Sequence, residues 1–134
     1  KLFEEFKSVK EIKPEFKFSN DTRFDFLCDK KIIEVKNVTL TRDSDFGEFP
    51  DAITSRGSKH LKKLIESIKK GYKAYVLFLT QIQDINKFKI AKDIDKNYYQ
   101  NYLLAKKGGV IFLAYRCYIS SDEIKIEKKI KIVD

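Results

Sequence analysis

Two segments of this sequence are apolar on both faces, and they constrain the fold more than any other feature. The first runs from Ile32 to Leu40, with apolar residues at odd and even positions alike, and the second runs from Ala74 to Leu79. A strand of this kind has to be covered on both sides, as the central strands of a sheet in an α/β protein are. The two segments therefore predict a sheet with a buried centre.

The segments around these two strands predict further strands and three helices. Alternation of polar and apolar residues predicts strands over 12–18, 24–28, 110–119 and 124–133, the last as part of an edge pair. Helices are expected over 2–9, over 55–70 behind a cap at Thr54 or Ser55, and up to 107 behind a cap at Asp93 or Asp95. Residues 41–53 are expected to form an irregular loop. Early hairpins and a later crossover helix indicate an α/β fold, a mixed sheet with helices on both faces.

Length and composition predict one domain over 1–134 that needs no disulfide or metal to fold. No segment approaches the ~18 consecutive apolar residues of a membrane span. The two cysteines, Cys28 and Cys117, are far apart in the chain, which fits a reducing cytoplasm. The chain starts at Lys1 and contains no methionine, so we expect a fragment with a segment missing upstream.

The net charge of +8 favours polyanionic partners, nucleic acid before anionic membrane. Lysines outnumber arginines 24 to 4 and are spread along the whole chain. A general enrichment in lysine explains the same charge equally well, so the charge alone does not select between these alternatives.

Asp25, Glu34 and Lys36 form the first candidate site. Residues i and i+2 of a strand share a face, so Glu34 and Lys36 should project together, with Asp25 beside them across a hairpin. Two converging carboxylates suit Mg²⁺, and a lysine beside them suits a phosphodiester substrate. Glu15, on the preceding strand, could add a ligand. The alternative is a structural ion pair of Lys36 with Glu34 or Asp25.

Arg56, Lys59, His60 and Lys63 form the second candidate site, at the start of the helix predicted over 55–70. Arg56 and His60 are four residues apart and therefore share a helix face. A helix N-terminus with basic side chains suits phosphate oxygens. The alternative is an ordinary solvated basic face on which His60 only packs or caps.

Several longer motifs resemble the sugar fermentation stimulation protein A family. They are TRFDFL at 22–27, IEVKNVTL at 33–40, FPDA at 49–52, RG at 56–57, KHL at 59–61, GV at 109–110 and LAYR at 113–116. The resemblance runs in order from about residue 3 to the C-terminus.

The resemblance implies a restriction-endonuclease-like mixed sheet flanked by helices, the C-terminal PD-(D/E)XK part of a two-part protein. The upstream OB-like part of the family would be absent from this chain. The resemblance also implies nonspecific DNA binding and regulation of sugar (maltose) utilisation. The nuclease motif would fall on Asp25, Glu34 and Lys36, with Glu15 as an accessory acid and Mg²⁺ or Mn²⁺ as cofactor.

Three functions follow as hypotheses. The first is a metal-dependent DNA nuclease that contacts mostly the DNA backbone, in the cytoplasm and associated with the nucleoid. The second is a noncatalytic DNA-binding regulator of sugar metabolism on the same scaffold. The third is a structural or protein-interaction domain whose charge serves solubility. Salt-dependent DNA binding separates the first two from the third, and metal-dependent cleavage separates the first from the second.

Overall fold

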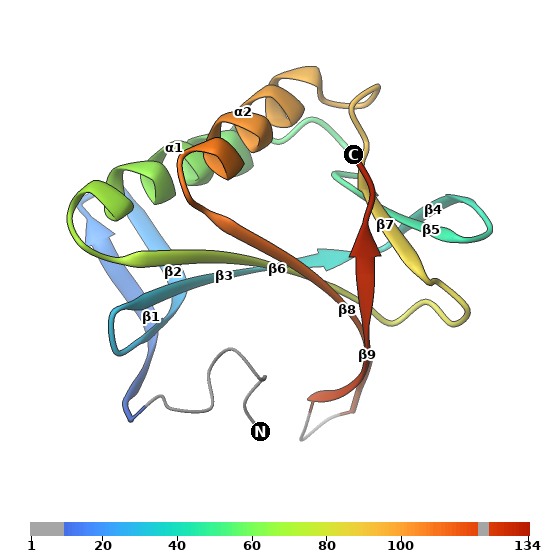
Figure 1. The fold of residues 1–134 in the computed structure, drawn as a ribbon, viewed down its shortest axis with the longest axis horizontal. Coiled ribbons are helices and arrows are strands. Elements are labelled where there is room, and N and C mark those ends of the chain that lie inside the picture. Colours follow the sequence, from blue (N-terminus) through green and yellow to red (C-terminus); the bar gives the residue numbers. More distant parts are fainter. Residues whose placement is uncertain (1–9, 121–123) are drawn as a thin grey trace.

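The computed structural model describes residues 10–120 and 124–134 of the chain (Figure 1). The helix expected over 2–9 from Leu2, Phe3, Phe6 and Val9 lies outside the described residues. The elements in chain order are β1 (Ile12–Ser19), β2 (Thr22–Cys28), β3 (Lys31–Val38), β4 (Leu40–Asp43), β5 (Phe46–Phe49), α1 (Ser55–Lys69), β6 (Lys73–Thr80), β7 (Lys87–Ile90), α2 (Lys96–Lys107), β8 (Ile111–Ile119) and β9 (Ile124–Ile132).

The strands of the described chain form one mixed sheet in the order β1-β2-β3-β6-β8-β9-β7-β5-β4. Antiparallel pairs join β1 to β2 and β2 to β3, and parallel pairs join β3 to β6 and β6 to β8. The two segments that are apolar on both faces became β3 and β6, which lie side by side inside the sheet. Burial of β6 from Ala74 to Thr80 confirms the prediction of a covered central strand.

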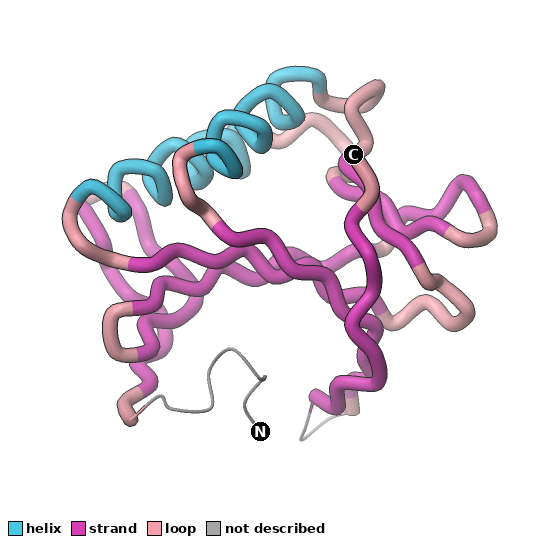
Figure 2. Tube along the Cα trace, in the orientation of Figure 1, coloured by secondary structure: helices cyan, strands magenta, loops and turns pink. Residues whose placement is uncertain are grey.

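Both helices lie on the same face of the sheet (Figures 1 and 2). Leu61 and Leu64 of α1 and Tyr98 and Tyr102 of α2 belong to one buried cluster with the strand residues of that face. The buried cluster on the opposite face consists of strand residues alone. Within residues 10–120 and 124–134 the helices therefore cover one face and not both, while the third helix expected, over 2–9, lies outside these residues. The two helices pack against each other and fill one layer, whereas periodicity along a helix does not reveal which face it covers.

The predicted boundaries of the two described helices are confirmed, and one carboxylate links their starts. Thr54 caps α1 by accepting a hydrogen bond from the amide of Gly57 at 3.0 Å. Asp95 caps α2 by accepting from the amide of Tyr98 at 2.9 Å, and its other oxygen accepts from the amide of Thr54 at 2.8 Å. A Cβ on Gly57 would lie 3.1 Å from the Tyr98 ring and 2.9 Å from the Thr54 side chain, so only glycine fits there.

Residues 41–53 are not the irregular loop that was expected, because β5 and most of β4 lie within them. The strands are four residues long each, and β5 contains Gly47 and the buried acid Glu48. Gly47 suits this strand because a Cβ would lie 3.2 Å from a methyl group of Val38. The Glu48 carboxylate is satisfied by Arg42, whose guanidinium donates to it at 2.6 and 3.1 Å and also binds Asp93. Long-range contacts of this kind leave no local pattern.

Strand β9 was expected at an edge of the sheet, but it lies between two other strands. It pairs with β8 on one side and, through Lys131 and Ile132, with β7 on the other. Strand β7 has no counterpart in the sequence prediction, since its four residues are too short to give a clear period. Because β7 was not predicted, β9 had no expected partner on its second side, and its alternation of lysine and isoleucine is typical of an edge strand.

Asp95→Ala should lower the free energy of unfolding by roughly 2 kcal/mol, because it removes the cap of α2 and leaves the Thr54 amide without its acceptor. Urea unfolding measures this loss. Asp51→Ala is the control, since Asp51 is exposed and should change stability by less than about 0.5 kcal/mol. Equal stabilities of the two variants would show that Asp95 does not hold the helix starts together.

Candidate functional site

The candidate site lies where β2 and β3 stop pairing. Backbone pairing joins Phe26 to Ile33 and continues from there toward the turn. Asp25 and Glu34 occupy the next position, and there side chains take over the role of the backbone. The amide of Asp25 donates to Oε1 of Glu34 at 3.3 Å, and the amide of Val35 donates to Oδ2 of Asp25 at 2.7 Å. The structure thus brings together the two acids that the sequence places across a hairpin.

Glu34 is buried, with 4% of its surface exposed, and its Oε2 atom has two basic partners. Nδ1 of His60 lies 2.6 Å from Oε2, and Nζ of Lys36 lies 3.3 Å from it. Lys36 therefore shares a face with Glu34, as expected from residues i and i+2 of a strand. Val35 points the other way and packs against the cluster on the helix-free face. The Glu34–Lys36 ion pair of the structural alternative is thus also present.

The pKa of the Asp25 carboxyl is raised above its ordinary value. Partial burial of the carboxyl is the largest cause, although the residue as a whole is exposed, and the neighbouring Glu34 carboxylate raises this pKa further. The hydrogen bond from the Val35 amide and the charge of Lys36 lower it, but they do not compensate. Two acids this close resist carrying two negative charges, which adds to the cost of ionising Asp25.

Burial also raises the pKa of Glu34, but here its partners prevail. The hydrogen bond to His60 and the charge of Lys36 outweigh burial and lower the pKa of Glu34 below its ordinary range. Glu34 is therefore ionised near neutral pH. The repulsion between the two acids raises the pKa of Asp25 and not that of Glu34.

His60 is buried, unlike the exposed residues Arg56 and Lys59 with which the sequence analysis grouped it. It comes from α1, is 5% exposed, and packs edge-on against Phe24 with ring centroids 5.7 Å apart. Its Nδ1 binds Glu34, 26 residues away in the chain. No sequence pattern marks such a contact, which is why His60 was not assigned to the acid pair.

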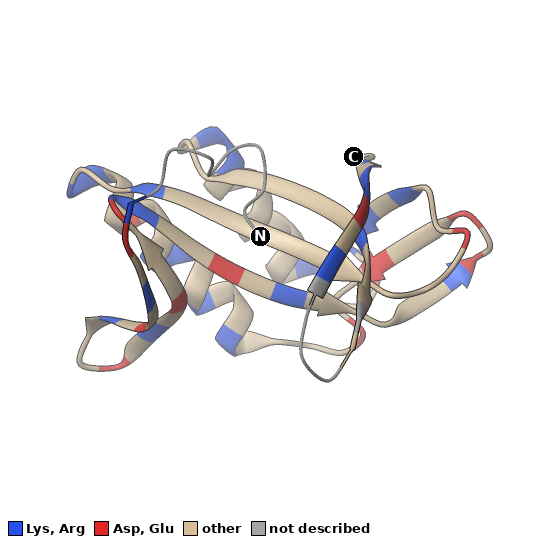
Figure 3. Cartoon of the chain, turned by 90° about the horizontal axis from the view of Figure 1, so that it is seen from below, with Lys and Arg blue, Asp and Glu red and all other residues tan. Residues whose placement is uncertain are grey.

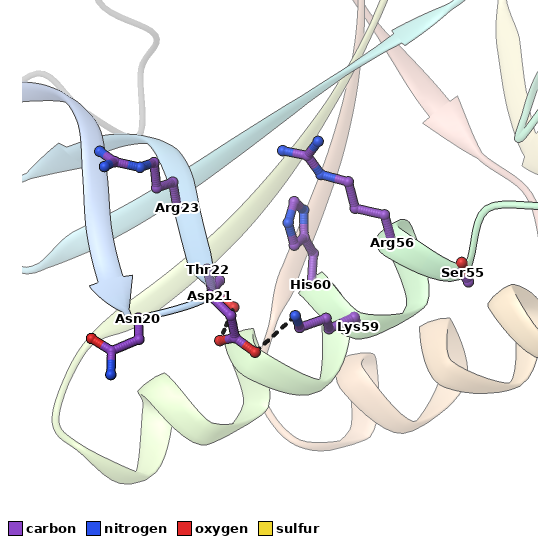
Figure 4. Close-up of a pocket in the computed structure, with 8 residues that line it drawn as sticks. All are labelled: Asn20, Asp21, Thr22, Arg23, Ser55, Arg56, Lys59 and His60. Carbon is purple, nitrogen blue, oxygen red and sulfur yellow. Dashed lines mark hydrogen bonds and ion pairs between the residues drawn. The ribbon is translucent and has the colours of Figure 1, made fainter.

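The other residues of the predicted basic face of α1 differ in how they are engaged. Nζ of Lys59 lies 2.8 Å from a carboxylate oxygen of Asp21, and Nζ of Lys63 lies 3.6 Å from one of Glu66. Arg56 is exposed and lines a groove beside His60. This groove has a volume of about 660 Å³ and lies between the β1–β2 turn and the start of α1 (Figure 4).

Glu15 lies in β1 opposite Asp25, since Pro14 pairs with Phe26 and Phe16 pairs with Phe24, and its role as an accessory ligand stays a prediction. It is exposed, has a left-handed φ of 52°, and has no hydrogen bond or ion pair with Asp25, Glu34 or Lys36 among the described residues. Nor do residues 10–120 and 124–134 contain three or more histidine, cysteine or acidic side chains grouped as metal ligands. A metal ion at this site would use the two carboxyls and complete its shell with water and substrate.

One buried polar atom near the site has no protein partner. The hydroxyl of Tyr98 finds no hydrogen bond among the described residues, although Tyr98 is fully buried. Burial raises the pKa of this hydroxyl, and the charge of Glu34 adds to the shift. The hydroxyl therefore stays protonated, and an ordered water is the simplest partner for it.

Fold and site together define a mixed α/β domain with an acid pair at the divergence of two strands. A family model described as "Sugar fermentation stimulation protein RE domain" matches residues 1–123. The chain belongs to the sugar fermentation stimulation protein family, which confirms the resemblance in its motifs. In the described residues, neither helix combines the length and the apolar character that crossing a membrane requires.

Curated relatives agree with this membership. The chain is 65% identical over 127 residues to a sugar fermentation stimulation protein homolog of Pelagibacter ubique, which covers 92% of this chain and 55% of the relative. It is 40% identical over 131 residues to the homolog of Clostridium beijerinckii, which covers 95% of this chain and 57% of that relative. The chain thus spans about half the length of the curated relatives it matches.

A solved structure agrees as well. The structure of Pyrococcus furiosus SfsA in complex with Ca²⁺ matches with a TM-score of 0.84 and 27% sequence identity. The match covers 97% of this chain and 58% of that chain.

Replacing Asp25 by asparagine should stabilise the protein near neutral pH. A raised pKa in the folded state means that folding favours the protonated acid, so this contribution to stability is lost as the pH rises through the folded-state pKa. Asparagine removes the charge and keeps an oxygen for the Val35 amide. We expect a higher free energy of unfolding for Asp25→Asn at about pH 7, measured by urea unfolding.

The difference from wild type should shrink as the pH falls toward 3.8, the ordinary value for aspartate, because the folded protein then carries a neutral Asp25 anyway. Asp51→Asn is the matched control, because Asp51 is likewise an exposed aspartate. An Asp25→Asn variant no more stable than wild type at neutral pH would refute the charge repulsion between the two acids.

Proposed function

We propose that this chain is a DNA-binding domain with a Mg²⁺- or Mn²⁺-dependent nuclease site of the PD-(D/E)XK type and little sequence preference. Asp25, Glu34 and Lys36 would form the site. The observation that carries the proposal is the convergence of the two carboxyls where β2 and β3 separate, with Lys36 on the same face. Partial burial and, after it, the nearby Glu34 carboxylate raise the pKa of Asp25, and perturbed pKa values are concentrated at functional sites.

The donor set fits a hard divalent cation. Mg²⁺ is commonly held by one or two carboxylates, with waters and substrate phosphate as the other ligands, and such a cation would offset the repulsion between Asp25 and Glu34. The Pyrococcus furiosus relative was solved with Ca²⁺, a cation that also prefers oxygen ligands. When bound, the metal would polarise a phosphodiester and lower the pKa of a coordinated water.

The side chains around the acids would act through position and charge. Lys36 is 17% exposed, so its ammonium group is within reach of a substrate phosphate while it stays beside Glu34. It would offset negative charge that develops on the phosphate. His60 would hold the Glu34 carboxylate in place, since its Nδ1 binds the same oxygen as Lys36. Arg56, with Lys59 and Lys63 farther along α1, would contact the DNA backbone.

The second candidate function is a noncatalytic DNA-binding regulator of sugar (maltose) metabolism. One observation favours it: Glu34 already has His60 and Lys36 as partners, so the buried charge is compensated without any metal. An acid pair of this kind would then be structural, and the basic groove alone would carry the function.

A plasmid-nicking assay with Mg²⁺ or Mn²⁺ separates these two functions. Wild type should nick supercoiled DNA, and Asp25→Asn should lower the rate by roughly 100-fold or more, since changes to outer-shell groups alone cost about 10–100-fold. Asp25→Asn is a better test than Glu34→Ala, because Glu34 also binds His60 and Lys36. DNA binding by Asp25→Asn should be unchanged or slightly tighter, because a negative charge is removed.

Asp51→Asn, purified in the same way, is the control and should nick like wild type. Equal nicking by wild type and Asp25→Asn would eliminate this acid pair as the catalytic site. If neither protein nicks while both still shift the plasmid at low salt, the noncatalytic regulator is the correct function.

Divalent cations should raise the melting temperature of wild type more than that of Asp25→Asn. A ligand that binds only the folded state stabilises it by about 2.7 kcal/mol at a concentration 100 times its dissociation constant. Titrations of Mg²⁺ and Ca²⁺ in a thermal unfolding assay would measure the gain, with NaCl at equal ionic strength as the control. Equal shifts in both proteins would place cation binding elsewhere.

A further inference from the structure

The basic residues of this protein differ in the contacts that they make, although they are spread widely over the fold. Lysine and arginine occur on both helices and many strands, interspersed with acids (Figure 3). Within α1, Nζ of Lys63 and Nζ of Lys70 lie 3.6 and 3.7 Å from carboxylate oxygens of Glu66, one helical turn away. Lys59 of the same helix instead pairs with an acid of another element, Asp21.

The Lys59–Asp21 ion pair bridges the groove between the β1–β2 turn and α1 (Figure 4). Nζ of Lys59 lies 2.8 Å from Oδ2 of Asp21. Both residues line the groove, Asp21 from the turn and Lys59 from the helix. The contact therefore spans the space that a ligand of this groove would enter.

The carboxylate of Asp21 is the fixed partner of this pair. Its Oδ1 accepts hydrogen bonds from the hydroxyls of Ser19 at 2.9 Å and Thr22 at 3.2 Å, while Oδ2 binds Lys59. The contact with Lys59 and, after it, the hydrogen bond from Ser19 hold the pKa of Asp21 far below its ordinary value. Asp21 therefore carries a full negative charge at neutral pH.

Lys59 is the partner that is free to turn away. Its ammonium group sits on a flexible four-carbon stem, and 45% of its side-chain surface is exposed. Exposed ion pairs contribute little to stability, so an anion that enters the groove can replace the carboxylate at low cost. The ammonium group of Lys59 thus has a choice between an internal anion and an external one.

We propose that Asp21 competes with nucleic acid for Lys59: its carboxylate holds Lys59 in the free protein, and a backbone phosphate of a bound strand takes Lys59 over. The contact is autoinhibitory, because binding has to break it. It keeps the affinity of the groove below the value that the basic side chains alone would give. The inference rests on the proposed function, in which Lys59 contacts the DNA backbone, and adds the residue that opposes this contact.

Asp21→Asn should tighten the binding of a fluorescent DNA duplex, measured by anisotropy with EDTA present so that cleavage plays no part. The dissociation constant should fall about threefold, within the range measured for exposed ion pairs. Asparagine still offers an oxygen to Ser19 and Thr22 but no longer attracts Lys59. The dependence of binding on salt should become steeper by up to about one counterion. Asp51→Asn removes the same charge from another exposed aspartate and should change binding much less.

A double-mutant cycle separates competition for Lys59 from a general effect of charge. In a Lys59→Gln background, Asp21→Asn should no longer tighten binding, because the lysine for which the carboxylate competes is gone. Lys62→Gln removes an exposed charge of the same helix outside the groove lining, and in this background Asp21→Asn should keep its full effect. Melting temperatures close to wild type are expected for all of these variants, since the pair is exposed.

The inference is overturned if Asp21→Asn binds DNA no tighter than Asp51→Asn, or if its gain persists undiminished in the Lys59→Gln background. Its failure is distinguishable from failure of the nuclease function. Coupling between Asp21 and Lys59 in a protein that never nicks DNA would retain the competition and remove catalysis, while nicking without this coupling would do the reverse. A protein that binds no DNA in any variant would overturn both.

Discussion

The buried charge of Glu34 is the interaction on which the rest of this structure depends. An isolated carboxylate without solvent costs several kcal/mol, so it persists only when neighbouring groups compensate it. Its partners come from three elements: the amide of Asp25 in β2, Lys36 in β3 and His60 in α1. Compensation of this charge therefore joins α1 to β2 and β3, in addition to the apolar packing of Leu61 and Leu64, at the side of the groove.

The same network explains why the neighbouring acid is strained electrostatically. His60 and Lys36 act mainly on Glu34, which stays ionised, and Asp25 carries the unfavourable part of the pair. Asp25 also has a structural role, since its carboxylate accepts a hydrogen bond from the amide of Val35. A cation bound at the proposed site would relieve the repulsion between the two acids.

Local patterns predicted those parts of the molecule whose causes are local. The central strands, both described helices with their caps at Thr54 and Asp95, and the shared face of Glu34 and Lys36 all follow from residue spacing. The acid pair follows from a short hairpin. The sequence did not reveal β7 or the β4–β5 pair, since four-residue strands depend on partners far along the chain.

Contacts between distant elements were missed for the same reason. Nothing in the sequence marks His60 as the partner of Glu34, or shows that Arg23 and Arg56 line one groove, until the fold brings His60 of α1 to Glu34 of β3. That α1 and α2 share one face of the sheet could not be predicted either, because amphipathic periods specify a buried side of each helix but not which layer buries it.

The divergence of β2 and β3 also makes the site depend on hairpin register. Asp25 and Glu34 meet because the turn at Asp29 and Lys30 sets the pairing of Phe26 with Ile33. Side chains alternate between faces along a strand, so a shift by one residue turns a side chain to the other face of the sheet. Lengthening this turn by one residue could leave hairpin, helices and groove in place and still separate the acids. The length of a two-residue turn is thus as much a part of this site as its charged side chains.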